Sequence, residues 1–197
     1  MAYDAWAESI RLIADGLPDQ PVRLSRRRRF APIAFDVDGD VAATRFLRRG
    51  AGVFWDEIHL LVADGSGSWR MLGGSRSWGD PQDRTAEGFV RARYDLAPHQ
   101  VVVGGYSMVR RDSDRRLPWT GRWVRAAEVL VGSQIACLVV AGRQLPVRYH
   151  GHLVVVWGSR RPPAVTACDA AGRLVAAVTL PDGRPRHRVI WHRRWSV

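Results

Sequence analysis

Two pairs of side chains have the residue types of an acid/base or metal-binding site, and "WDEIHLL" at residues 55–61 holds the first pair. The segment alternates like a β-strand, which places Asp56 in an apolar stripe and His59 on the opposite face. A carboxylate buried in such a stripe needs a partner or a raised pKa, and raised pKa values are typical of catalytic acids. Asp56 and His59 are therefore candidate catalytic residues around a small pocket. The alternative is that His59 lies at the surface and Asp56 pairs with an arginine such as Arg45, Arg48 or Arg70.

His150 and His152 form the second pair, in "YHGHLVVVW" at residues 149–157. On a β-strand, residues i and i+2 point to the same face, and metal sites on β-barrels take two histidine ligands in this way. The pair is a candidate metal site whose remaining ligands could be His187, His192 or Asp169. The alternative is ordinary strand chemistry beside a glycine turn.

An aspartate motif follows an apolar run in "IAFDVDGDVAAT" at residues 33–44. It resembles the first motif of the haloacid dehalogenase-like phosphatases, and the resemblance implies Asp36 as the nucleophile, Asp38 as a general acid and a magnesium ion. The motif departs from the family at Asp40, where the family has threonine or valine, and that family also needs a doubly wound α/β sheet. Asp-Gly between two extended runs is, in contrast, a strong hairpin signal. We interpret Asp38 and Gly39 as the turn of a β-hairpin.

The net charge of +11 comes with 30 basic residues, all of them arginine, because the chain contains no lysine. Asparagine is also absent, and this pattern indicates a GC-rich coding sequence such as that of a high-GC bacterium. Residues 131–197 contain ten arginines and two acidic residues. A basic region of this kind can bind polyanions, although it can also be a solvated surface.

The segment "RPRHRVIWHRRW" at residues 184–195 combines arginine with tryptophan. Arginine contacts phosphate, tryptophan stacks on bases, and both are needed on a nucleic-acid surface. The alternative is a last β-strand whose arginines face water, and the run Arg26–Arg29 could add to a basic surface if the fold brings it near. The candidate polyanion-binding residues are Arg184, Arg186, Arg188, Trp191, Arg193, Arg194 and Trp195.

Composition predicts a globular protein outside the membrane. Hydrophobic residues make up 46% of the chain, which is enough for a core, and no apolar run is long enough to span a bilayer. The N-terminal residues lack the basic start and apolar stretch of a secretory signal, so we expect a cytoplasmic protein. Cys137 and Cys168 are then expected to be buried thiols.

The hydrophobic periodicity predicts one helix followed by many short strands. Residues 3–15 have apolar positions at helical spacing, and a period of two begins at Phe30. Residues 29–47 and 53–74 each predict a β-hairpin, and residues 73–88 predict a loop and a region boundary. The run Leu153–Trp157 is apolar on both faces and predicts a central strand. Further strands are expected within residues 88–96, 100–110, 122–132, 135–142, 152–158, 164–172 and 174–180.

These patterns predict a mainly β fold, with an N-terminal helix and β-hairpins followed by an antiparallel, immunoglobulin-like β-sandwich. The expected regions are residues 1–80 and 88–197, or one continuous domain. We expect a non-enzymatic interaction or accessory protein whose basic Arg/Trp face binds nucleic acid, another polyanion or an acidic protein, with no cofactor and no membrane partner. The alternative is a small enzyme or ligand-binding protein that uses Asp56 with His59, or a metal at His150 and His152.

Overall fold

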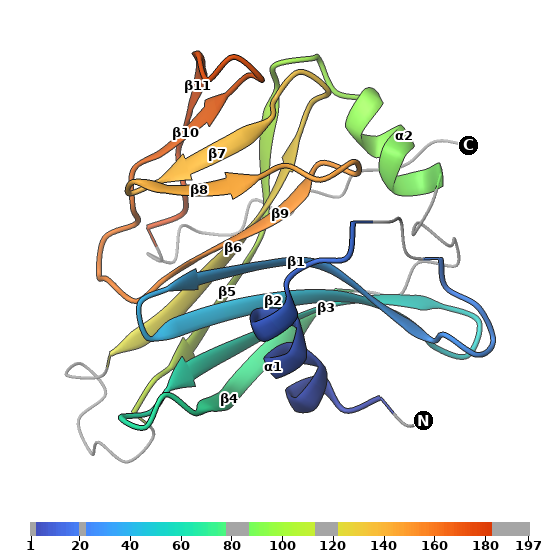
Figure 1. Cartoon of the computed structure of the whole chain (residues 1–197), viewed down its shortest axis with the longest axis vertical. Helices are drawn as coiled ribbons and strands as arrows, with labels where there is room; N and C mark the ends of the chain where they lie inside the picture. The colour runs from blue at the N-terminus through green and yellow to red at the C-terminus, as the bar shows by residue number, and fades with distance from the viewer. Residues whose placement is uncertain (1–2, 20–22, 78–86, 113–121, 183–197) are drawn as a thin grey trace.

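A computed structural model describes residues 3–19, 23–77, 87–112 and 122–182, which form a mainly β fold with one N-terminal helix (Figure 1). In chain order the elements are α1 (Ala5–Asp15), β1 (Phe30–Asp38), β2 (Val41–Arg49), β3 (Phe54–Ala63), β4 (Trp69–Arg76), α2 (Phe89–Tyr94), β5 (Val101–Arg110), β6 (Trp123–Val131), β7 (Cys137–Val140), β8 (Arg143–Pro146), β9 (His152–Trp157), β10 (Val165–Cys168) and β11 (Leu174–Val178).

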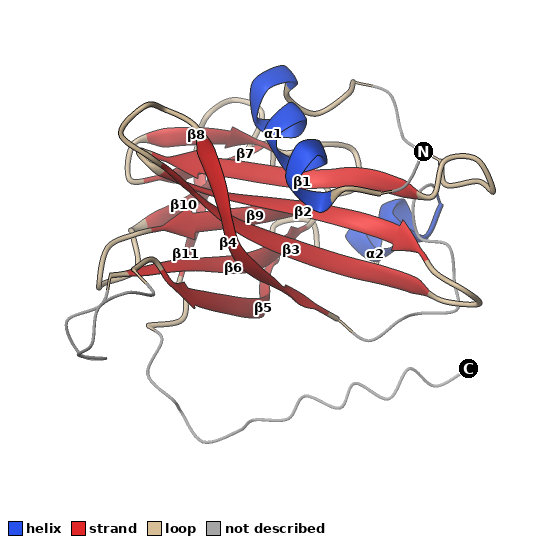
Figure 2. Cartoon of the chain, turned by 90° about the horizontal axis from the view of Figure 1, so that it is seen from below, coloured by secondary structure: helices blue, strands red, loops and turns tan. Residues whose placement is uncertain are grey.

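The strands form three antiparallel sheets, which we name A, B and C (Figure 2). Sheet A has the order β1-β2-β3-β4, sheet B the order β5-β6-β9, and sheet C the order β11-β10-β7-β8. Antiparallel sheets and the N-terminal helix confirm the predicted class. Sheet A consists of the two predicted hairpins and their junction, and Gly39 provides the positive φ of 60° that the first hairpin turn requires.

Sheet B lies between two apolar cores, because its two faces belong to different clusters of buried side chains. Val154 and Val156 of β9 pack with sheet A residues such as Leu60. Val155 and Trp157, on the opposite face of β9, pack with sheet C residues. The core shared by sheets A and B therefore joins the first half of the chain to the second. The division into residues 1–80 and 88–197 stays a prediction.

Three local expectations differ from the structure. Residues 88–96 were expected to be a strand, but they contain α2, because Arg93 fixes the segment by donating to backbone carbonyls of residues 132–149. The expected loop at 73–88 begins later, since β4 continues to Arg76. The run Leu153–Trp157 lies in an edge strand of its own sheet. Both of its faces are nevertheless buried, since sheets A and C cover them; Figure 1 shows β9 passing between β1 and β8.

Cys137 and Cys168 are free thiols that lie directly opposite each other on β7 and β10. Cys168 is buried and Cys137 is partly buried, and burial together with the neighbouring thiol raises the pKa of Cys137. Within the described residues, the structure contains no helix that is long and apolar enough to cross a membrane.

Gly151 fixes the start of β9, and its replacement tests that role. Its φ is +71°, and an added Cβ would lie 2.6 Å from the Val131 carbonyl oxygen. Gly172 has a φ of +76° with open space around the same position. We expect Gly172→Ala to lower the free energy of unfolding by about 1–2 kcal/mol through backbone strain alone. Gly151→Ala is expected to cost a further ~1–3 kcal/mol from the clash. Equal losses for the two variants in urea unfolding would contradict the close approach.

Candidate functional site

A buried arginine links sheets A and B. Arg45 on β2 is only 4% exposed, and its Nε and Nη2 atoms donate to the Asp56 carboxylate at 2.8 and 2.5 Å. Arg45 Nη2 also lies 3.0 Å from Glu128 Oε2 on β6. A planar guanidinium can donate two parallel hydrogen bonds to one carboxylate, as it does here to Asp56. The two carboxylates together offset the cost of burying the charge of Arg45. Asp56 therefore has the arginine partner that the sequence offered as the alternative.

His59 lies on the other face of β3, where it contacts Tyr3 and Glu57. Its Nε2 is 3.0 Å from the Tyr3 hydroxyl and 3.8 Å from Glu57 Oε2. Burial lowers the pKa of His59. Asp56 and His59 thus point to opposite faces of one strand, as alternation predicts, and the structure does not bring the two candidates together into one site.

His150 and His152 lie close together, with ring centroids 5.8 Å apart, but the ring nitrogens of His150 are engaged. Its Nδ1 accepts a hydrogen bond from the His152 backbone N–H at 3.0 Å, and its ring also bonds the backbone of Ile33. Among the described residues, no three or more His, Cys, Asp or Glu side chains are grouped to hold a metal ion. Of the suggested further ligands, Asp169 binds Arg173, whereas His187 and His192 lie outside the described residues.

Arginines gather at the end of sheet A where β1 begins and β2 ends, on the right of Figure 1. Ser25 organises the run Arg26–Arg29, because its hydroxyl accepts from the backbone N–H groups of Arg27 and Arg28 at 3.2 and 3.0 Å. The Arg49 N–H donates to the Arg29 carbonyl at 2.7 Å, which extends the β1–β2 pairing to these residues. We name Arg26, Arg27, Arg28, Arg29 and Arg49 the arginine edge.

The arginine edge carries charge that no described carboxylate neutralises. Arg26–Arg29 are exposed, Arg49 is half-buried, and none of the five forms an ion pair with a described acidic residue. Glu57, on the strand that pairs with β2, is already shared by Arg48 and Arg76, at 2.7 and 3.0 Å.

Aromatic side chains lie beside this charge. The guanidinium of Arg49 is 5.8 Å from the Phe54 ring centre, and that of Arg76 is 5.1 Å from the Trp55 ring centre. The end of sheet A therefore combines arginine with tryptophan, which is the chemistry expected for residues 184–195. The candidate residues of that segment, from Arg184 to Trp195, lie outside the described residues.

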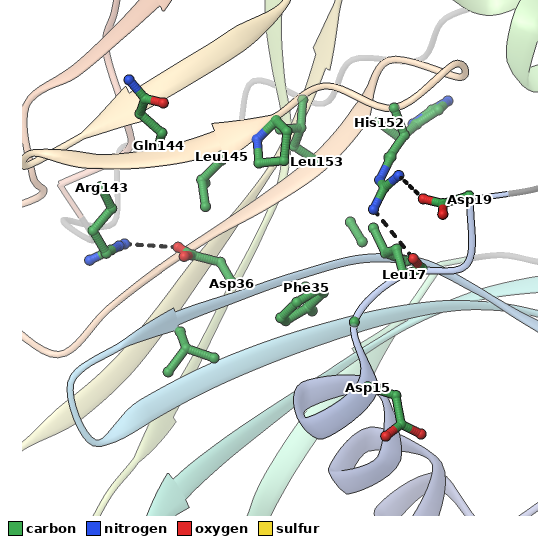
Figure 3. Close-up of a pocket in the computed structure, with 15 residues that line it drawn as sticks. Asp15, Leu17, Asp19, Phe35, Asp36, Arg143, Gln144, Leu145, His152 and Leu153 are labelled. Carbon is green, nitrogen blue, oxygen red and sulfur yellow. Dashed lines mark hydrogen bonds and ion pairs between the residues drawn. The ribbon is translucent and has the colours of Figure 1, made fainter.

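The aspartates of the hairpin motif join all three sheets. Asp36 Oδ2 on β1 accepts from the Val156 N–H on β9 and from Arg143 Nη2 on β8, both at 2.9 Å. Arg143 Nη1 also donates to Asp38. In Figure 3, Asp36 and Arg143 point toward one another across the gap between β1 and β8. The motif that resembles a phosphatase is thus a hairpin whose carboxylates pair with an arginine and with the open edge of β9.

A pocket of about 570 Å³ opens next to this junction. It is lined by the end of α1 and the residues after it, by β1, by β8 and by the start of β9 (Figure 3). The sequence does not indicate this pocket, because Arg143 lies in no recognisable motif and pairs with Asp36 from 107 positions away. The one indication of this site in the sequence was Asp36 itself, an aspartate within an otherwise apolar strand.

Comparisons of the chain with protein-family models, with curated proteins and with solved structures find no match.

Replacing Arg45 tests the buried ion pair. Arg45→Met leaves Asp56 and Glu128 without their cation, so we expect the free energy of unfolding to fall by about 3–5 kcal/mol in urea titrations. Arg11→Met is the control, because Arg11 pairs with Glu8 at the surface and its side chain is 61% exposed. The control should change stability by less than ~1 kcal/mol. A loss for Arg45→Met no larger than that of the control would contradict a structural role for this pair.

His150 should make stability depend on pH. Burial, followed by the charges of Arg45, Arg93 and Arg148, lowers the pKa of His150 from 6.5 to about 4. The unfolded chain therefore takes up a proton before the folded chain does, and stability is lost as pH falls from 6.5 toward 4. The full loss is about 3 kcal/mol. We expect the free energy of unfolding, measured at several pH values across this window, to depend only weakly on pH for His150→Asn. For the exposed control His99→Asn it should still fall steeply as the pH falls. Equal slopes in the two variants would rule out His150 as the source.

Proposed function

We propose that this chain is a non-enzymatic interaction protein that binds a polyanion, or an acidic segment of a protein partner, through the arginine edge. The observation that carries the proposal is the exposure of Arg26–Arg29 beside Arg49 with no ion-pairing carboxylate among the described residues. A row of like charges repels itself, and a bound polyanion would relieve that repulsion.

Two arginines within the fold, Arg45 and Arg143, provide a contrast. Arg45 and Arg143 lie between sheets and pair with carboxylates on neighbouring strands. Their charges serve the fold, whereas those of the arginine edge are available to a partner. The candidate acid Asp56 is likewise engaged with an arginine, and so is the neighbouring Glu57, which favours binding over catalysis as the role of this half of the chain.

Arg76 and Trp55 add a stacking surface to the charge. Arg76 is half-exposed, with 54% of its side chain accessible, and its guanidinium lies over the Trp55 ring. Arginine and tryptophan planes stack on bases with little sequence preference. This combination supports nucleic acid as the first polyanion to test. The predicted residues at 184–195 would extend the surface if they lie near the same end.

Binding should depend steeply on salt. We expect fluorescence anisotropy of labelled single- and double-stranded oligonucleotides to show binding that survives ~150 mM salt, with log K falling linearly in log salt. Arg27→Gln combined with Arg28→Gln should make that slope shallower by about 1–2 units, because each arginine that leaves a phosphate changes the slope by about one.

The matched control is Arg160→Gln combined with Arg161→Gln, which removes the same charge from another exposed site. Equal effects of the two double variants would contradict the arginine edge as the binding surface. Affinity that does not respond to salt would contradict polyanion binding itself. Neutralising Arg186, Arg188, Arg193 and Arg194 tests the predicted contribution of the C-terminal segment in the same assay. If nucleic acid does not bind and a labelled acidic peptide such as oligo-glutamate does, the result favours an acidic protein as the partner.

A further inference from the structure

The pocket between β1 and β8 has the size and lining of a small-molecule site. Its volume of about 570 Å³ lies within the range of roughly 300–1,000 Å³ that is usual for such sites. Apolar side chains form part of its lining: Leu17, Phe35, Leu145, Pro146 and Leu153. Charged groups stand at its two ends, Asp36 with Arg143 at one and Asp19 with Arg148 at the other (Figure 3).

Asp36 presents an acceptor that the described residues leave unused. The residue is only 2% exposed, and its Oδ2 atom takes the hydrogen bonds from both Val156 and Arg143. Its other oxygen, Oδ1, is buried and has no hydrogen-bond partner among the described residues. Burial raises the pKa of Asp36. A buried carboxylate oxygen without a donor is costly, and a ligand that supplies a donor would gain that energy.

The terminal nitrogens of the two pocket arginines are committed to the protein. Arg143 directs both terminal nitrogens to Asp36, Asp38 and the Val156 carbonyl. Arg148 directs its terminal nitrogens to Asp19 and the Leu17 carbonyl. Recognition of a carboxylate or phosphate uses the paired N–H groups of a guanidinium fork. Only the buried Nε atom of each arginine is without a partner among the described residues, so neither arginine offers such a pair. The pocket is therefore poorly suited to an anion.

The charge of the residues that line the pocket also disfavours an anion. Three carboxylates, those of Asp15, Asp19 and Asp36, line the pocket, against the two guanidinium groups of Arg143 and Arg148. Asp38 also forms an ion pair with Arg143. This pocket is thus locally acidic in a chain whose net charge is +11.

We propose that this pocket binds a small organic amine with an apolar body, whose ammonium group donates to Asp36 Oδ1 while its apolar part lies against Phe35 and Leu145. The site is separate from the arginine edge, so this inference goes beyond the polyanion-binding function and does not rest on it. Either can fail without the other, because the two ligands have opposite charge and lie on different elements.

Three probes with the same apolar body and different head groups test the proposal. We would titrate the full-length protein with 4-phenylbutylamine, 4-phenylbutanol and 4-phenylbutanoate and follow binding by protein-observed NMR. The expected order of affinity is amine, then alcohol, then acid, with the amine at least tenfold tighter than the acid. Tighter binding of the acid, equal binding of amine and alcohol, or no binding at millimolar concentration would each overturn the proposal.

Two variants locate the site. Asp36→Asn keeps the shape of the side chain and removes its charge, so it should abolish the preference for amine over alcohol. Leu145→Trp should fill the pocket and abolish binding of all three probes, which keeps the proposal testable if Asp36→Asn does not fold. Leu174→Trp is the control, since Leu174 is 66% exposed and does not line the pocket. Unchanged amine binding in a folded Leu145→Trp protein would place the ligand elsewhere and overturn the assignment.

Discussion

The arrangement of sheets A and B depends on the buried guanidinium of Arg45. Its charge is held between Asp56 on sheet A and Glu128 on sheet B, so the ion pair is complete only when the two sheets take their observed positions. Burying apolar side chains supplies most of the driving force for packing but does not fix orientation, because it has no direction. Directional pairing can supply the register that apolar contact leaves open. Asp36 and Arg143 play the same part between sheets A, B and C.

Arginine therefore has two roles in this chain. Between the sheets, its fork joins carboxylates on strands that are distant in sequence, and these arginines account for the acidic residues that the sequence offered as catalytic candidates. At the arginine edge, a serine-organised turn presents several guanidinium groups to solvent without neighbouring carboxylates among the described residues. Composition alone could not separate these roles, since both draw on the same excess of arginine.

Local signals in the sequence predicted the elements whose causes are local. Asp4 accepts hydrogen bonds from the N–H groups of Trp6 and Ala7 and begins α1, and Gly39 makes the first hairpin turn. The sequence did not predict the short helix α2, because this helix depends on hydrogen bonds from Arg93 to residues far along the chain. The edge position of β9 and the pocket beside Asp36 were also not predicted, because both depend on contacts between residues that are distant in sequence. Asp56 with His59, and His150 with His152, were predicted from residue type and spacing. Partners from other parts of the chain determine what each of these side chains does.

The most direct test of the polyanion-binding account is hydrogen–deuterium exchange of the chain with and without a 20-nucleotide single strand at ~150 mM salt. Ordering of a surface by a ligand slows exchange of the amides beneath it. The account predicts slower exchange in peptides that cover residues 23–30 and 48–56, with no change over β10 and β11. Binding that leaves residues 23–30 unprotected would contradict the assignment of the arginine edge as the functional surface.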